Sequence, residues 1–122
     1  MVGYVTLGTN DLERTAQFYD ELLAQLGAKR FMDTETFIAW VASPKGCALS
    51  ITKPFDGKAA TVGNGVMVAL RVDSNEKVDA LYRKAIELGA TDEGAPGPRG
   101  DGFYAGYFRD PDGNKLNAFC MG

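Results

Sequence analysis

Residues 107–119 decide the fold of this chain, and they run in the order Tyr107-Phe108-Arg109-Asp110-Pro111-Asp112-Gly113-Asn114-Lys115-Leu116-Asn117-Ala118-Phe119. The stretch joins two apolar segments, residues 103–109 and 115–120, which we expect to form strands. Between them, the proline fixes one φ angle, and the glycine or an asparagine accepts a positive one. This pattern predicts a tight turn, so the chain should close with a β-hairpin.

Alternation along the first of these two strands separates its aromatic side chains. Phe103 and Tyr107 fall on one face, whereas Tyr104 and Phe108 fall on the other. One face is a candidate platform for a flat or apolar ligand. We expect the opposite face to pack on a helix.

The hairpin closes the second of two similar halves, and the first half starts at the N-terminus. A strand at Tyr4–Gly8 leads into a helix that Asn10 or Asp11 can cap. Glu13 follows Asn10 by three residues and completes a capping-box pattern. Gly27 can end this helix in the left-handed conformation.

The second half repeats this order of signals. A strand at residues 66–72 leads into a helix that Asp73 can cap, with Glu76 at the capping-box position and Gly89 at its end. Two features recur at a spacing of 62 residues: Leu26-Gly27-Ala28 as Leu88-Gly89-Ala90, and Asp11 as Asp73. Two coincidences at one spacing indicate an internal duplication.

Short strands follow each expected helix. They should lie at residues 29–32, 37–42 and 47–53 in the first half and at residues 91–93, 103–109 and 115–120 in the second. Residues 95–102 should form an irregular loop. Each half is then a βαβββ module, and we expect one domain with module one at about residues 1–56, a linker at about 57–64 and module two at about 65–122.

Length and composition place the chain among globular proteins with a core of their own. It has 122 residues, of which 45% are apolar and 24% are charged. No apolar run approaches the ~20 residues that cross a bilayer, and the N-terminus lacks the pattern of a signal peptide. The net charge is −3 and the 13 basic residues are scattered, which argues against a nucleic-acid partner. We expect a cytoplasmic protein without membrane contact.

The chain contains no histidine and two cysteines. Without histidine, serine–histidine nucleophilic catalysis is excluded. Cys47 and Cys120 each lie in an apolar strand pattern, which is typical of buried free thiols in a cytoplasmic protein. A disulfide or a two-cysteine metal site is the alternative, although no CxxC pair is present.

Taken together, these features resemble the vicinal oxygen chelate superfamily, which includes glyoxalase I, bleomycin-resistance proteins and extradiol dioxygenases. The segments that carry the resemblance are residues 4–8 (YVTLG), 10–12 (NDL), 18–19 (FY), 54–57 (PFDG), 63–65 (GNG) and 109–114 (RDPDGN). They cover nearly the whole chain, and they are specific for the superfamily but not for one reaction. The resemblance implies an α+β fold, with two tandem βαβββ modules whose curved mixed sheets form a shared concave pocket.

The resemblance also implies where a metal ion would bind. In the metalloenzymes of that superfamily, ligands come from the first and last strands of each module, and these positions fall at Tyr4, Ser50, Met67 and Asn117. Their phenol, hydroxyl, thioether and carboxamide groups carry no charge at pH 7. Because iron, nickel and zinc prefer imidazole and carboxylate ligands, we predict no metal and no other cofactor at this location.

A neutral, partly polar floor can instead hold an unidentified small molecule. We expect the ligand-binding site to be lined by Tyr4, Met67, Asn117, Ser50, Trp40, Phe103 and Tyr107. For Trp40 the choice is open, because Phe37 lies three residues away on the opposite strand face and one of the two should be core. The alternative for Tyr4, Met67 and Asn117 is that they only pack the sheet interior.

Four basic residues are weaker candidates. Arg71 and Arg109 lie at strand ends, where a guanidinium can clamp a carboxylate through two parallel hydrogen bonds, and Arg99 and Lys53 are similar. The alternative is that each is solvated or pairs with a neighbouring acid.

Three functions follow from these observations. The first is binding or sequestration of a small molecule without metal, by a protein of the glyoxalase/bleomycin-resistance type. The alternative is a lactoylglutathione lyase-like or other small-molecule enzyme with a non-standard site, for which the sequence names no catalytic residue. The third is a partner-binding module, and the resemblance implies a homodimer.

Overall fold

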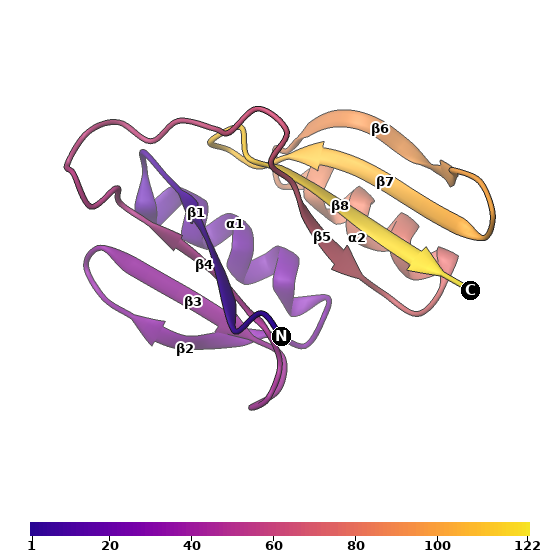
Figure 1. Ribbon diagram of the computed structural model, residues 1–122, viewed down its shortest axis with the longest axis horizontal. Helices are drawn as coiled ribbons and strands as arrows, with labels where there is room; N and C mark the ends of the chain where they lie inside the picture. The colour runs from indigo at the N-terminus through magenta and orange to yellow at the C-terminus, as the bar shows by residue number, and fades with distance from the viewer. The chain divides into compact units, whose positions relative to one another are not determined.

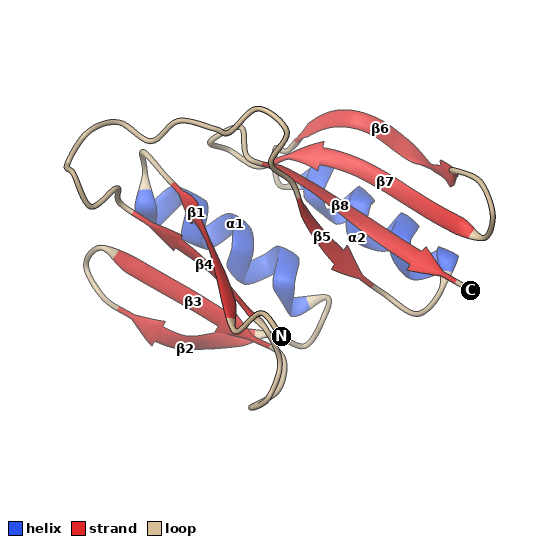
Figure 2. Cartoon of the chain, viewed as in Figure 1, coloured by secondary structure: helices blue, strands red, loops and turns tan.

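The structure is a computed structural model that describes residues 1–122. The chain divides into two compact units, the first module (Met1–Val62) and the second module (Gly63–Gly122). Each module contains a four-stranded sheet with a single helix (Figures 1 and 2). The predicted α+β fold of two βαβββ modules is confirmed. Neither helix has the length and apolar character needed to cross a membrane.

The first module has one helix between its first two strands. Its elements are β1 (Tyr4–Gly8), α1 (Leu12–Ala24), β2 (Lys29–Asp33), β3 (Phe37–Val41) and β4 (Ala48–Thr52). The strand order is β1-β4-β3-β2, in which β1 and β4 are parallel and the other pairs are antiparallel. The parallel pair requires the long connection through α1 and the β2–β3 hairpin.

The helix α1 forms because its apolar residues recur at helical spacing. Its buried side chains are Leu12, Thr15, Ala16, Phe18, Tyr19, Leu22 and Leu23. They pack on the sheet face that carries Ile38, Trp40, Leu49 and Ile51, all of them buried. Burying one large apolar side chain contributes about 1.5–3 kcal/mol, so this layer is the core of the first module.

The second module repeats the arrangement, with longer strands after its helix. Its elements are β5 (Val68–Arg71), α2 (Asn75–Glu87), β6 (Thr91–Pro98), β7 (Phe103–Arg109) and β8 (Lys115–Met121). The strand order β5-β8-β7-β6 matches that of the first module, and β5 is parallel to β8. Both helices have 13 residues. This correspondence supports the duplication predicted from the sequence.

An equivalent backbone hydrogen bond occurs in each module and fixes which residues of the two modules correspond. The amide of Thr9 donates to the carbonyl of Thr52 over 3.0 Å, and the amide of Val72 donates to the carbonyl of Phe119 over 2.9 Å. Each bond lies just beyond the parallel strand pair of its module. Two residues earlier on the last strands, Ser50 therefore corresponds to Asn117.

The prediction of the helix caps is half right. Asp11 caps α1, since its side chain accepts from the amide of Arg14. The predicted cap Asp73 of α2 is wrong, because Ser74 accepts from the amide of Lys77 while Asp73 forms an ion pair with the Lys77 ammonium. Asp73 lies one residue too early for its carboxylate to take the place of Ser74.

The glycine-rich stretch after α2 is the second difference from the expectation. The sequence predicts a strand at 91–93 and a loop at 95–102, but β6 continues to Pro98. Its pairing with β7 shifts register twice, and Gly94 lies between the two shifts with φ +147°. Glycine and proline locally favour a loop. The neighbouring β7 nevertheless supplies the partner that keeps this stretch in the sheet.

The two cysteines are less buried than the sequence suggests. Cys47 is exposed, and Cys120 is half-buried. Cys47 lies outside β4, which begins at Ala48, so it does not take part in the alternation that would bury it. The expectation of a buried thiol is therefore wrong for Cys47.

Candidate functional site

Each sheet has one face covered by its helix and one open face that the helix does not cover. In the second module, Leu116, Ala118 and Phe108 are fully buried on the face toward α2. The Tyr104 hydroxyl on that face donates to Asp79 of α2 over 2.7 Å. Phe103 and Tyr107 point the other way, as alternation predicts, so they belong to the open face of the second module.

Asn117 lies in the middle of this open face and has an unused acceptor. It stands between Ala69 on β5 and Tyr107 on β7. Its side chain is 1% exposed, and its Oδ1 atom has no hydrogen-bond partner. Leaving a buried polar atom unsatisfied costs about 1–3 kcal/mol. Such an atom is the first place to look for a bound molecule.

Aromatic rings lie next to Asn117 on this face. Phe119 follows it by two residues on β8 and stacks on Phe103, with ring centroids 5.5 Å apart. Tyr107 is its cross-strand neighbour on β7. The rings give the open face of the second module flat apolar surfaces beside a polar centre.

Three cations lie on these rings. The Arg71 guanidinium is 5.4 Å from the centroid of Phe119. The Arg99 guanidinium and the Lys115 ammonium lie 5.5 Å and 5.4 Å from the centroid of Tyr107. The basic residues that form ion pairs are Arg30, Lys77 and Arg109. The three cations on the rings therefore have no acidic partner. The three cations therefore keep their capacity to bind a negative group.

Arg99 is held in place by the backbone of β6. Its Nη2 atom donates to the carbonyl of Ala95 over 2.6 Å. A Cβ atom at Gly97 would lie 3.1 Å from Nη1, and one at Gly94 would lie 3.5 Å from Nη2. Gly97 thus leaves space in which the guanidinium lies against its strand and over Tyr107, whereas a carbon at Gly94 would be in ordinary contact with it.

Arg109 differs from these three cations. Its Nε atom pairs with Glu93 over 2.9 Å, and its Nη1 atom donates to the carbonyl of Gly113. Its partner is thus Glu93 and not the neighbouring Asp110. Arg109 closes the β7–β8 hairpin and has little left to offer a ligand.

The predicted site residues of the first module have other surroundings. Ser50 is fully buried, and its hydroxyl donates to the Val5 carbonyl over 2.7 Å and lies 2.8 Å from the Thr6 hydroxyl. Tyr4 is 63% exposed. Its ring is nearly perpendicular to that of Phe37, and the two ring centroids are 6.4 Å apart. Ser50 and Tyr4 both face away from α1, but Ser50 has its hydrogen bonds satisfied.

Trp40 and Met67 complete the predicted set. Trp40 lies on the face covered by α1, where it packs on Tyr19 and its Nε1 atom donates to Asp20 over 2.8 Å. It is core, so Phe37 and not Trp40 reaches the open face of the first module. The expected place of Trp40 in a ligand site differs from its place in the core, where its indole N–H finds its partner on the helix. Met67 is partly exposed and directly precedes β5.

An ion network beside Trp40 stabilises the helix-covered side of the first module. Arg30 donates to both carboxylate oxygens of Asp20 and also pairs with Asp33. The hydrogen bond from Arg30, with a further one from Trp40, lowers the pKa of Asp20. The hydrogen bond to Asp20 in turn raises the pKa of Arg30. Arg30 is saturated by acids and cannot serve as an anion site.

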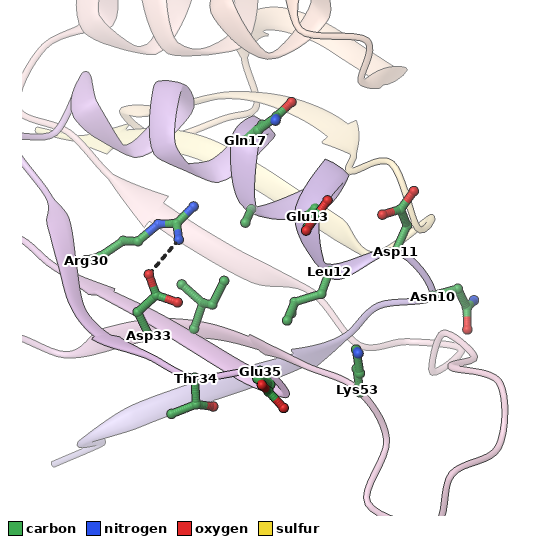
Figure 3. Close-up of a pocket in the computed structure, with 12 residues that line it drawn as sticks. Asn10, Asp11, Leu12, Glu13, Gln17, Arg30, Asp33, Thr34, Glu35 and Lys53 are labelled. Carbon is green, nitrogen blue, oxygen red and sulfur yellow. Dashed lines mark hydrogen bonds and ion pairs between the residues drawn. The ribbon is translucent and has the colours of Figure 1, made fainter.

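A cavity of about 710 Å³ lies beside this network, between the start of α1 and the β2–β3 hairpin. Figure 3 shows the Arg30–Asp33 pair at one end of it and Lys53 at the other. Its lining comprises Asn10, Asp11, Leu12, Glu13, Ala16, Gln17, Arg30, Asp33, Thr34, Glu35, Ile38 and Lys53. Its size suits a small molecule, but only Lys53 among the predicted candidates lines it.

The second module has a shallower hollow of about 510 Å³ on its helix side. Two tyrosines in its lining already use their hydroxyls, since Tyr82 donates to Asp92 and Tyr104 donates to Asp79. Burial, and then the hydrogen bond to Asp92, raise the pKa of Tyr82 to about 12. These phenols are protonated at neutral pH and have partners, so they offer no reactive group.

The chain can now be placed among known proteins. Residues 1–118 match the model of the Glyoxalase/Bleomycin resistance protein/Dioxygenase superfamily. The chain belongs to this superfamily. No curated protein matches it.

Solved structures of the glyoxalase superfamily have the same fold. A glyoxalase/bleomycin resistance protein from Albidiferax ferrireducens T118 is 38% identical, with a TM-score of 0.91 over 100% of this chain and 99% of that one. A glyoxalase/bleomycin resistance protein/dioxygenase family enzyme from Burkholderia phytofirmans PsJN is 20% identical, with a TM-score of 0.78 over 98% and 97%. A putative glyoxalase from Bacillus halodurans is 24% identical, with a TM-score of 0.78 over 98% and 95%. The last two likenesses concern the fold alone.

The metal of the glyoxalase metalloenzymes does not fit the residues at the corresponding positions. Ser50 already donates its proton to the Val5 carbonyl, and Asn117 offers a neutral carboxamide oxygen. Divalent iron, nickel and zinc prefer imidazole and carboxylate. No group of three or more Cys, Asp or Glu side chains elsewhere in residues 1–122 is arranged to hold a metal ion.

Proposed function

We propose that this protein binds a small organic molecule on the open face of its second module, without a metal ion. The observation that carries the proposal is the Oδ1 atom of Asn117, which is buried and lacks a hydrogen-bond partner. A ligand hydroxyl or N–H group at this atom would remove an unfavourable contribution of about 1–3 kcal/mol. The protein would therefore gain stability from a ligand of suitable shape.

The surroundings of Asn117 support the same function. Phe119 and Tyr107 give apolar contact area, and a ligand site combines such area with a few polar groups that fix orientation. The corresponding Ser50 of the first module is satisfied by Val5 and Thr6. A binding role is thus better supported for the second module than for the first.

The test is a titration with planar compounds of different charge. Nuclear magnetic resonance would follow the side-chain amide of Asn117 and the backbone amides of Tyr107 and Phe119. Asn117→Leu should weaken binding without loss of stability, because it removes the unsatisfied polar atom and keeps the volume. Ser50→Ala is the matched control in the first module and should leave binding unchanged. If no compound moves the three signals, the proposed function is wrong.

The enzymatic alternative has a separate test. A glyoxalase I reaction needs a metal ion that polarises the enediolate, together with a carboxylate base. The protein would be incubated with nickel, zinc or iron and the hemithioacetal of methylglyoxal. Stoichiometric metal together with turnover would contradict binding without metal. Homodimerisation stays a prediction, which sedimentation at micromolar concentration can test.

A further inference from the structure

We infer that the ligand of the second module is a planar organic anion that also carries a hydrogen-bond donor, with hydroxylated aromatic carboxylates as the representative class. The inference rests on the proposed function and names the ligand of that same face. It follows from three properties of the face: its charge, its flat surfaces and its unused acceptor.

The charge of the face favours an anion. Arg71, Arg99 and Lys115 lie on the aromatic rings, and none of them has an acidic partner. Glu93 comes from the neighbouring strand β6, but Arg109 already pairs with it. A cationic ligand would meet three uncompensated positive charges, whereas a carboxylate would compensate them.

The cations can move from ring to ligand with a net gain. A cation over an aromatic ring at an exposed site contributes little to stability. A hydrogen bond to a charged group contributes more. A guanidinium such as Arg99 would therefore exchange a weaker partner for a stronger one when a carboxylate arrives.

The rings favour a flat ligand. Phe119 and Phe103 are stacked with an interplanar angle of 23°, and Tyr107 flanks Asn117 on the neighbouring strand. Aromatic rings gain from offset or edge contacts with another ring, beyond the area that they bury. A planar ligand can make such contacts while its polar atoms lie near Asn117.

The Asn117 acceptor sets the distance between the two polar groups of the ligand. Lys115 and Asn117 are two residues apart on β8, and same-face neighbours along a strand are separated by about 6.7 Å. A benzene ring with a carboxylate and a hydroxyl at opposite positions spans a comparable distance. The carboxylate would then bind the cations while the hydroxyl donates to Oδ1.

Four probes test the inference: three isosteres, namely 4-hydroxybenzoate, its neutral amide 4-hydroxybenzamide and its cationic counterpart 4-hydroxybenzamidine, and benzoate, which lacks the donor. The signals of Asn117, Tyr107 and Phe119 are followed during titration. We expect 4-hydroxybenzoate to bind about tenfold more tightly than the amide and than benzoate, and the amidine to bind most weakly. A tenfold difference corresponds to about 1.4 kcal/mol.

Three variants and one control connect the preference to named residues. Arg99→Gln should weaken 4-hydroxybenzoate about tenfold and leave the amide unchanged, and Lys115→Gln should act in the same direction. Arg83→Gln is the control, because Arg83 lines the hollow on the helix side of the same module. Asn117→Leu should abolish the preference for 4-hydroxybenzoate over benzoate.

The outcomes separate this inference from the proposed function. If the amide or the amidine moves the same signals at concentrations equal to or lower than the anion, the ligand class is wrong and binding at this face stands. If benzoate binds as tightly as 4-hydroxybenzoate, the role of the Asn117 acceptor is wrong. If none of the four probes moves the signals of the face, both the inference and the proposed function fail.

Discussion

Thr6 and Ala69 take equivalent places in the two modules, and they leave their neighbours in different states. Thr6 stands opposite Ser50, and the two hydroxyls lie 2.8 Å apart. Ala69 stands opposite Asn117 and offers no hydroxyl, so the Asn117 oxygen lacks a partner. The backbone pairing is the same in both modules, so the difference comes from the side chains: Ser50 also donates to the Val5 carbonyl, whereas the Asn117 oxygen meets no donor.

The cations of the two modules differ in the same sense. In the first module, Arg30 lies 5.9 Å from the ring centroid of Trp40, and Asp20 and Asp33 bind it. In the second module, the cations over Phe119 and Tyr107 have no acidic partner. A duplicated fold thus keeps its hydrogen-bonded backbone, while equivalent side chains have partners in one copy and lack them in the other.

Truncating a core side chain of the first module should have the largest effect on stability. Trp40→Ala removes a fully buried side chain and one hydrogen bond to Asp20, so we expect a loss of about 3–5 kcal/mol in the free energy of unfolding. Phe119→Ala on the open face of the second module should cost about 1 kcal/mol. Urea denaturation followed by circular dichroism measures both. Equal losses would contradict the assignment of Trp40 to the core.

Giving the second module the missing hydroxyl should remove the difference between the modules. Ala69→Thr places a hydroxyl opposite Asn117, as Thr6 stands opposite Ser50. We expect a gain of about 1 kcal/mol in the free energy of unfolding and weaker binding of 4-hydroxybenzoate. The reverse change, Thr6→Ala, should not affect binding, since Ser50 still donates to Val5. A variant that gains stability and still binds fully would count against the role of Asn117.

Displacing one cation should have a smaller effect. In Gly97→Ala the new methyl group would lie 3.1 Å from Nη1 of Arg99, so the guanidinium must shift by a few tenths of an ångström from its place over Tyr107. The affinity for 4-hydroxybenzoate should fall by about two- to fivefold, which corresponds to about 0.5–1 kcal/mol. Gly3→Ala serves as the control, because nothing lies within 4 Å of its added carbon. Unchanged affinity in Gly97→Ala would show that the position of Arg99 does not matter.

The smallest effect should appear in the acid range and in the first module. Arg30 lowers the pKa of Asp20, so the folded state holds this carboxylate deprotonated more strongly than the unfolded chain does. The resulting stability is present above the ordinary pKa of about 3.9 and is lost as the pH falls through the lower value of the folded state. Urea midpoints should therefore drop below about pH 4, and the drop should be shallower in Asp20→Asn. An identical pH profile in that variant would exclude Asp20 as the cause.

Much of the fold was predictable because its signals are local. Alternation placed Phe103 and Tyr107 on one face of β7 and Phe108 on the other, since successive side chains point to opposite sides of any strand. Gly27 and Gly89 have φ angles of +74° and +100°, which glycine adopts without strain and which end the two helices. The repeat of these signals revealed the two modules.

The candidate site was predictable only in part. The resemblance located Asn117 and Ser50 at corresponding positions, but nothing in their own neighbourhood along the chain indicates which of them is satisfied. That depends on the groups opposite each one, which are Ala69 for Asn117 and the Val5 carbonyl with Thr6 for Ser50. Strand pairing brings these groups from a distant part of the chain. The cations over the rings were equally invisible, because Arg99 reaches Tyr107 through the pairing of β6 with β7.

The sequence by itself therefore determined the order of strands and helices, the duplication and the alternation of faces, because each depends on residues close together along the chain. Only the tertiary structure decided which face each helix covers, and so that Trp40 is core while Phe37 is not. It also decided that Asn117 is buried without a hydrogen-bond partner. Burial and hydrogen-bond satisfaction belong to pairs of residues that meet only after folding, and register sets those pairs.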